Sequence, residues 1–164
     1  MRVIVYGHPA PQGSKKFVGV AKSTGRGILV ESSKRVKPWR QDVKAAAIEA
    51  RKGAAPLDGP LRVRMVFTLP KPKSAPKRRR TYPDRKPDLD KLCRSTLDSL
   101  VESGVIADDA RVIELTLLKV FPCEHEESLE IPGVVITVRT LDASTQEGHG
   151  RTASLGLQEA SQCA

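Results

Sequence analysis

The sequence predicts a single α/β domain in which helices pack on a mixed β-sheet. Strand-like runs of β-branched residues occur at 2–6, 61–69 and 133–139. Between them, residues 37–52 and 89–103 repeat apolar side chains every three or four positions, which is the period of a helix with one buried side. A chain of 164 residues can form one sizeable core but not two. These patterns do not give the order of the strands.

The other strands follow from the same patterning. Residues 2–6 end at a glycine and are expected to form an interior strand of the sheet. Two short strands at 17–20 and 27–31 flank a turn of Ser, Gly and Lys, which predicts a hairpin. A further apolar strand is expected at 112–121, after the second helix.

The first helix and the strand after it each leave an alternative open. Trp39, near the start of the helix, is expected to anchor the core, although its basic neighbours also suit contact with a phosphate backbone. In the strand at 61–69, Arg62 and Arg64 alternate with apolar residues, which predicts one buried and one cationic face. That cationic face either looks toward nucleic acid or is simply solvated.

The charge balance favours an anionic polymer as partner. Lys and Arg total 28 against 19 acids, which gives a formal net charge of +9. No apolar run has the length of a membrane span and the first residues lack the features of a signal peptide, so we expect a cytoplasmic protein. The three cysteines are scattered, which fits reduced thiols without a chemical role.

Basic residues concentrate in a proline-rich segment at 70–87, which we call the basic arm. Asp84 is its single acid, and its cations are Lys71, Lys73, Lys77, Arg78, Arg79, Arg80, Arg85 and Lys86. Such a segment cannot bury enough apolar surface to fold alone, so it is either a disordered loop or an arm that binds phosphates. We favour the arm. A second basic loop ends at Lys15 and Lys16, where DNA contact and an ordinary connection are about equally expected.

The second helix begins directly after the basic arm and has a charged ridge. Asp88 follows Pro87 at its start, where a carboxylate suits the free backbone N–H groups, and Gly104 is expected to end it. The ridge consists of residues four apart: Asp90, Arg94, Asp98 and Glu102.

A second acidic pair, Asp108 and Asp109, precedes the strand at 112–121. If this strand packs beside the helix, the two acidic clusters converge. The simplest interpretation is structural: a helix cap, an ion pair from Asp90 to Arg94 and a solvated turn. The functional interpretation is a site for a hard cation, Mg²⁺ or Mn²⁺, which prefers carboxylate oxygens. A carboxylate site beside a basic arm fits a metal-dependent enzyme that acts on a phosphodiester.

The order Asp88-Leu-Asp90, an aliphatic helix, Gly104 and the Asp108-Asp109 turn resembles the RusA family of Holliday junction resolvases. The match is good over residues 86–119 and looser elsewhere. The resemblance implies a RusA-like fold in which Asp88, Asp90 and Asp109 are the metal-binding catalytic carboxylates.

Two positions depart from the family pattern. Lys91 stands where Asn is usual, and Arg94 stands where a catalytic Lys is usual. Arginine keeps the charge and can grip a phosphate, but it cannot release its proton as lysine does. We therefore expect Arg94 to stabilise charge in the transition state, with Lys91 sharing this work and contacting DNA. Asp108 or Asp98 is expected to position a metal ligand or a metal-bound water. Similar proteins often carry a lysine near the position of Lys119, which makes Lys119 a further candidate site residue.

The resemblance implies a Mg²⁺-dependent endonuclease, with Mn²⁺ as an alternative, that cuts four-way DNA junctions as a homodimer. We expect a bacterial or phage-encoded, nucleoid-associated protein with the endonuclease domain at 1–139 and a disordered tail at 140–164. The predicted DNA contacts are Lys15, Lys16, Lys91 and the run from Lys77 to Arg80. Two alternatives remain: a non-catalytic nucleic-acid-binding protein, and a nuclease that prefers flaps or forks.

A cysteine and a histidine near two glutamates at 123–127 suggest zinc only weakly, because paired ligand spacing is absent. An exposed acidic turn is expected there instead.

Overall fold

The computed structural model describes residues 1–13, 15–21, 23–31, 34–76 and 79–141. Lys77, Arg78 and the chain beyond 141 lie outside the described residues, as do the side chains of Lys15 and Lys16. The elements in chain order are β1 (Arg2–Tyr6), β2 (Lys15–Val20), β3 (Gly27–Glu31), α1 (Val36–Arg51), β4 (Leu61–Thr68), α2 (Leu89–Glu102), the 3₁₀ helix η1 (Asp109–Arg111), β5 (Val112–Val120) and β6 (Gly133–Thr140).

The main sheet has four strands in the order β1-β6-β4-β5. β4 pairs parallel with β5 and antiparallel with β6, so the sheet is mixed, as predicted. β4 is central, and its second half, Met65 to Thr68, is buried throughout. Parallel pairing of β4 and β5 needs a crossover, and the basic arm and α2 provide it.

The expectation that β1 is an interior strand is wrong, because among the described strands β1 pairs with β6 alone and lies at the edge of the sheet. Its exposure alternates: Val3 and Val5 are buried, while Arg2, Ile4 and Tyr6 are not. The β-branched run therefore reflects one buried face of an edge strand, not burial on both sides.

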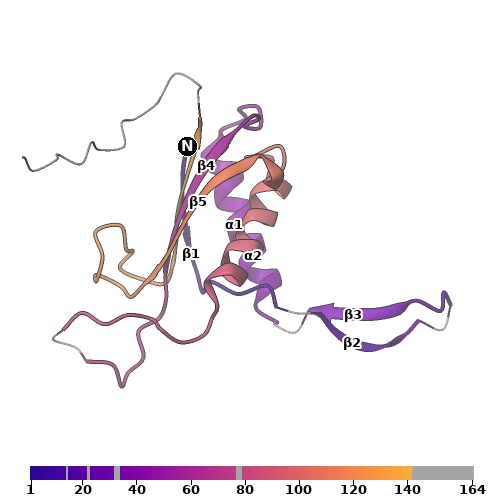
Figure 1. The fold of residues 1–164 in the computed structure, drawn as a ribbon, viewed down its shortest axis with the longest axis horizontal. Coiled ribbons are helices and arrows are strands. Elements are labelled where there is room, and N and C mark those ends of the chain that lie inside the picture. Colours follow the sequence, from indigo (N-terminus) through magenta and orange to yellow (C-terminus); the bar gives the residue numbers. More distant parts are fainter. Residues whose placement is uncertain (14, 22, 32–33, 77–78, 142–164) are drawn as a thin grey trace, which may run out of the picture.

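Helices α1 and α2 pack side by side on one face of the main sheet (Figure 1). Trp39 of α1 is 1% exposed and packs in the core with Val43 and Ala47, which confirms it as a core anchor. Leu92 and Leu100 place the apolar side of α2 in the same core. Neither described helix has the length and apolar character needed to cross a bilayer.

The predicted hairpin is confirmed as a separate two-stranded sheet made of β2 and β3. It extends away from the body of the protein, beyond the ends of the helices (Figure 1). A register shift between Phe17 and Gly19 interrupts its pairing.

Gly104 ends α2, as predicted. Its φ of +69° lies in the left-handed region that glycine adopts without strain, and its N–H donates to the carbonyl of Val101 at 2.9 Å. The Arg51 guanidinium of α1 donates to the Gly104 carbonyl at 3.0 Å. The end of α2 is thereby tied to α1, and a Cβ at this position would come within 2.5 Å of the guanidinium.

We predict that Gly104→Ala destabilises the fold more than Gly53→Ala. Both glycines have positive φ, so each alanine costs about 1 kcal/mol of backbone strain. Only Gly104 also has a side chain within contact distance of the added Cβ, and displacement of Arg51 there costs about 1 kcal/mol more. Urea denaturation of both variants measures the difference, and equal losses would contradict the prediction.

Candidate active site

The N-terminus of α2 presents Asp88 as predicted, but its carboxylate does not cap the helix. Asp88 occupies the N-cap position, yet no first-turn N–H donates to its side chain. Instead, the Lys91 ammonium lies 2.6 Å from the carboxylate. This contact lowers the pKa of Asp88, with smaller contributions from Lys86 and Lys119. Asp88 is therefore held in its charged form at the junction of the arm and the helix.

A cavity of about 270 Å³ contains Asp90 and Asp109. It lies between α2 and β5, and is lined by Asp90, Cys93, Arg94, Leu97, Asp98, Asp109, Leu115 and Leu117. Burial raises the pKa of the Cys93 thiol to about 11, and the nearby charge of Asp90 adds to this shift. The thiol therefore stays neutral, and the charged groups of the cavity are its aspartates and Arg94.

Three of these charged groups have no partner within the part of the chain that the structure describes. Asp90, Asp109 and Arg94 are exposed, and none of them makes a hydrogen bond or ion pair with another described residue. The structural alternative of an Asp90–Arg94 ion pair is therefore absent among these residues. Carboxylates without a partner beside one cavity are free to act as ligands of a cation.

Asp88 does not line this cavity. Among the described residues, the one group of three possible metal ligands that lie within 4.8 Å of one another is His125, Glu126 and Glu127. The carboxylates of Asp88, Asp90 and Asp109 are therefore not all within that distance of one another. The structure thus brings two of the three predicted aspartates together, and leaves the third beside them in an ion pair with Lys91.

The two acidic residues expected to support the site have other contacts. Asp108 accepts a hydrogen bond from the Ala110 N–H at 2.8 Å and so caps η1, the turn that contains Asp109. Asp98 lies 3.3 Å from the Arg40 guanidinium of α1. Asp108 therefore shapes the turn, and Asp98 links the two helices.

Lys119 of β5 fixes the chain that leads into α2. Its ammonium donates to the Arg85 carbonyl at 2.8 Å and to the Pro87 carbonyl at 3.1 Å. These contacts attach the end of the basic arm to the sheet immediately before Asp88.

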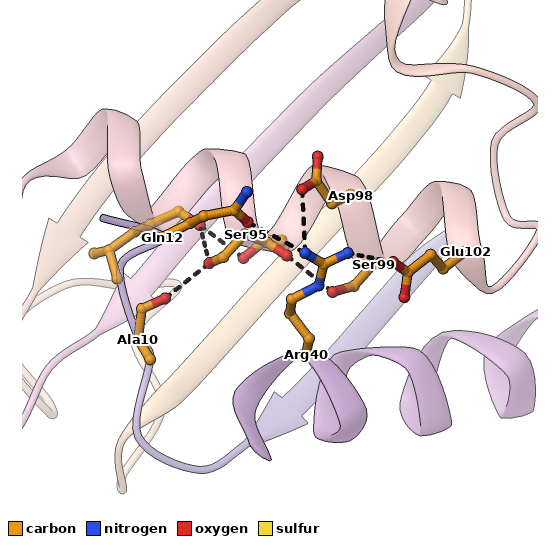
Figure 2. Close-up of polar contacts among 9 residues, drawn as sticks. Ala10, Gln12, Arg40, Ser95, Asp98, Ser99 and Glu102 are labelled. Atoms are coloured by element: carbon orange, nitrogen blue, oxygen red, sulfur yellow. Dashed lines mark hydrogen bonds and ion pairs between the residues drawn. The ribbon is translucent and has the colours of Figure 1, made fainter. Parts of the chain in front are cut away.

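Ser95 and Gln12, which the sequence patterns did not single out, dock the loop at 9–13 on α2. The Ser95 hydroxyl donates to the Ala10 carbonyl at 2.8 Å, and the Gln12 N–H donates to the Lys91 carbonyl at 3.0 Å. Arg40 is one of the basic neighbours of Trp39 for which contact with a phosphate backbone was the alternative, and it binds Gln12, Asp98 and Glu102 (Figure 2). One signal was available: Ser95 falls on the buried side of the helix, where a hydroxyl needs an acceptor.

The basic arm is docked on the protein rather than free. Glu124 accepts hydrogen bonds from the Lys71 ammonium and from the Thr81 N–H, the latter at 3.1 Å. Lys71 lowers the pKa of Glu124. Pro83 is buried. The alternative of a disordered loop therefore does not apply to the described part of the arm, which excludes Lys77 and Arg78.

The cationic face expected on β4 is largely neutralised. Arg62 pairs with Glu114 at 2.7 Å, and Arg64 donates to Glu127 at 2.9 Å through its Nε. Neither arginine is a free cation directed at nucleic acid.

The turn at 125–127 is less exposed than predicted. The possible ligand atoms of His125, Glu126 and Glu127 lie within 4.8 Å of one another, but only Glu126 is fully exposed. His125 Nδ1 accepts from the Glu127 N–H at 3.0 Å, and Arg64 lowers the pKa of Glu127. Internal contacts thus occupy two of the three groups.

A basic α/β protein with unpaired carboxylates beside a docked cationic arm belongs to the class of proteins that act on nucleic acids. Comparison with protein families identifies the family: the model described as Endodeoxyribonuclease RusA matches residues 7–139. The chain belongs to this family, whose members are endonucleases that resolve Holliday junctions by hydrolysing DNA. No curated protein matches the chain.

We predict that the Glu124 contacts stabilise the protein in a pH-dependent way. Because the folded-state pKa of Glu124 lies below its ordinary value of 4.5, the contribution is full above that pH and is lost as the pH falls through the lowered pKa. Calorimetry should therefore find that Glu124→Gln lowers Tm at pH 7, and that the difference from wild type shrinks as the pH falls below 4.5.

The matched control is Glu130→Gln, since Glu130 is exposed and has no ion-pair partner among the described residues. It should leave Tm unchanged across the same range. A pH-independent difference for Glu124→Gln would contradict the assignment.

Proposed function

We propose that the protein cuts branched DNA at the cavity between α2 and β5, using a divalent cation held by Asp90 and Asp109. The observation that carries this proposal is that these two carboxylates, 19 positions apart in the chain, line one cavity without a partner among the described residues. Asp88, two residues before Asp90 in the chain and kept ionised by Lys91, is the third carboxylate of the site.

The chemistry of these side chains fits Mg²⁺, with Mn²⁺ as the alternative. Carboxylate oxygens are the ligands that such hard cations prefer, and few protein ligands leave positions for water and phosphate. A bound divalent ion would supply a Lewis acid that activates water for attack on the phosphodiester and offsets charge on the leaving oxygen. The protein supplies the fixed carboxylates and the cationic surroundings.

Arg94 lines the same cavity and has a free guanidinium among the described residues. A guanidinium binds two phosphate oxygens at once and remains protonated at any physiological pH. We assign Arg94 to holding the scissile phosphate and stabilising its developing charge, not to removing a proton. Lys91 remains a proposed DNA contact, as do Arg79 and Arg80 of the arm.

The proposed substrate implies a dimer. A four-way junction has approximate two-fold symmetry, so paired cuts need two active sites in a fixed relation, which a C2 dimer provides.

We expect light scattering to give twice the 17.9 kDa mass of one chain at the concentrations where junctions are cut. A mass of one chain under those conditions, with both strands still cut in one binding event, would contradict the dimer.

We predict that Asp90→Asn and Asp109→Asn each lower the cleavage rate of a synthetic four-way junction by at least about 100-fold in Mg²⁺, because each removes a cation ligand. Binding of the junction without divalent ions should change little. Asp42→Asn is the matched control, since Asp42 is an exposed aspartate on α1 that lies outside the cavity, and it should cut at the wild-type rate.

The same assay separates the role of Arg94 from that of the carboxylates. Arg94→Ala should slow cutting without changing the affinity for Mn²⁺, and Arg94→Lys should recover part of the rate. Cleavage of flap, fork and linear duplex substrates, measured in parallel, shows which DNA structure the enzyme prefers. Wild-type cleavage by either aspartate variant would refute the proposed site.

A further inference from the structure

The basic arm encloses a second cavity, of about 730 Å³. Its apolar walls come from Leu69, from five prolines of the arm and from the rings of Tyr82 and Phe121. Prolines stiffen such walls, because their φ is already fixed before a ligand binds. The volume falls in the range of about 300–1,000 Å³ that is typical of small-molecule sites, which is the size class of a single nucleotide.

The charged residues around this cavity are nearly all cationic. Arg79, Arg80, Arg85 and Lys86 line it, and Asp84 is the only acid among its lining residues. Apolar walls with a cationic lining suit a ligand that combines a flat, weakly polar face with a negative charge. A nucleotide has this combination, in its base and its phosphate.

Tyr82 supplies a stacking surface. It is 68% exposed, so the fold does not use its ring for packing, and the Arg80 guanidinium lies 5.0 Å from the ring centroid. Exposed aromatic side chains in cationic grooves stack on unpaired bases with little regard to sequence, and each stacked base adds substantially to affinity.

The cavity is fixed in place next to the candidate active site. Glu124 holds Thr81 on one side of it, and Lys119 holds the carbonyls of Arg85 and Pro87 on the other. Pro87 is a lining residue and directly precedes Asp88. The cavity therefore reaches the residue that directly precedes the N-cap of α2.

We propose that the arm cavity binds an unpaired nucleotide at the branch point of the DNA, with the base stacked on Tyr82 and the phosphate among Arg79, Arg80, Arg85 and Lys86. This inference rests on the proposed function and names the part of the substrate that the arm recognises, an unstacked base instead of intact duplex. Intact duplex keeps its bases stacked inside the helix, so it can reach the arm only through its phosphates.

The test is binding measured by fluorescence anisotropy without divalent ions, where no cutting occurs. The DNA is a four-way junction with one unpaired thymidine at the branch point, compared with a linear duplex of equal length. We expect Tyr82→Ala to weaken junction binding about tenfold and to leave duplex binding unchanged. Tyr82→Phe should bind like wild type, because it keeps the ring.

Tyr6→Ala is the matched control, because Tyr6 is 58% exposed and lies on β1, outside the arm. It should bind both DNAs like wild type. Tyr82→Ala removes no cation, so its plot of log affinity against log salt concentration should keep the wild-type slope. An unchanged Tm for Tyr82→Ala would show that the fold is intact.

Two results would overturn the inference: wild-type junction binding by Tyr82→Ala, or an equal loss of affinity for junction and duplex. Cleavage of the junction by the wild-type protein in Mg²⁺ is measured separately. Absence of cleavage would refute the proposed function and would leave the binding comparison interpretable on its own.

Discussion

The placement of Asp90 and Asp109 at one cavity is the constraint on which the proposed active site depends. Their side chains line one cavity, and neither carboxylate has a hydrogen-bond or ion-pair partner among the described residues. Two like charges at one site are disfavoured unless an opposite charge offsets them. A divalent cation held by both carboxylates, as we propose, would offset their charge and would connect this cavity with the DNA hydrolysis of the family.

The contacts around α2 explain how the rest of the molecule maintains this arrangement. Lys119 fixes the chain before the helix, Ser95 fixes the loop at 9–13 against it, and Arg40 links it to α1. At the other end, Gly104 and Arg51 attach the helix terminus to α1. These contacts restrain the position of α2 in the protein, while the Asp90 carboxylate has no hydrogen-bond or ion-pair partner among the described residues.

Local patterning predicted much of this structure. Apolar spacing predicted α2, its end at Gly104 and the strand that follows, because these depend on residues close in the chain. The approach of Asp109 to Asp90 also followed once helix and strand were assumed to pack together. The edge position of β1 did not follow, because strand order depends on pairing between segments that are distant in sequence.

The partners of the charged side chains were also beyond prediction. From the sequence, Arg40 was only one of the basic neighbours of Trp39 that suit contact with a phosphate backbone, and its pairing with Asp98 depends on the packing of α1 against α2. Likewise, Asp88 has the position of a helix cap, but its carboxylate pairs with Lys91. The basic arm has the composition of a disordered loop, but Glu124 holds it on the protein. Each outcome depends on a tertiary contact that composition does not encode.

The central claim is tested most directly by anomalous scattering from crystals soaked in Mn²⁺, which locates the bound ion without reference to activity. The account predicts a peak in the cavity between α2 and β5, within ligand distance of Asp90 and Asp109. A peak only at His125, Glu126 and Glu127, with none at the two aspartates, would contradict it.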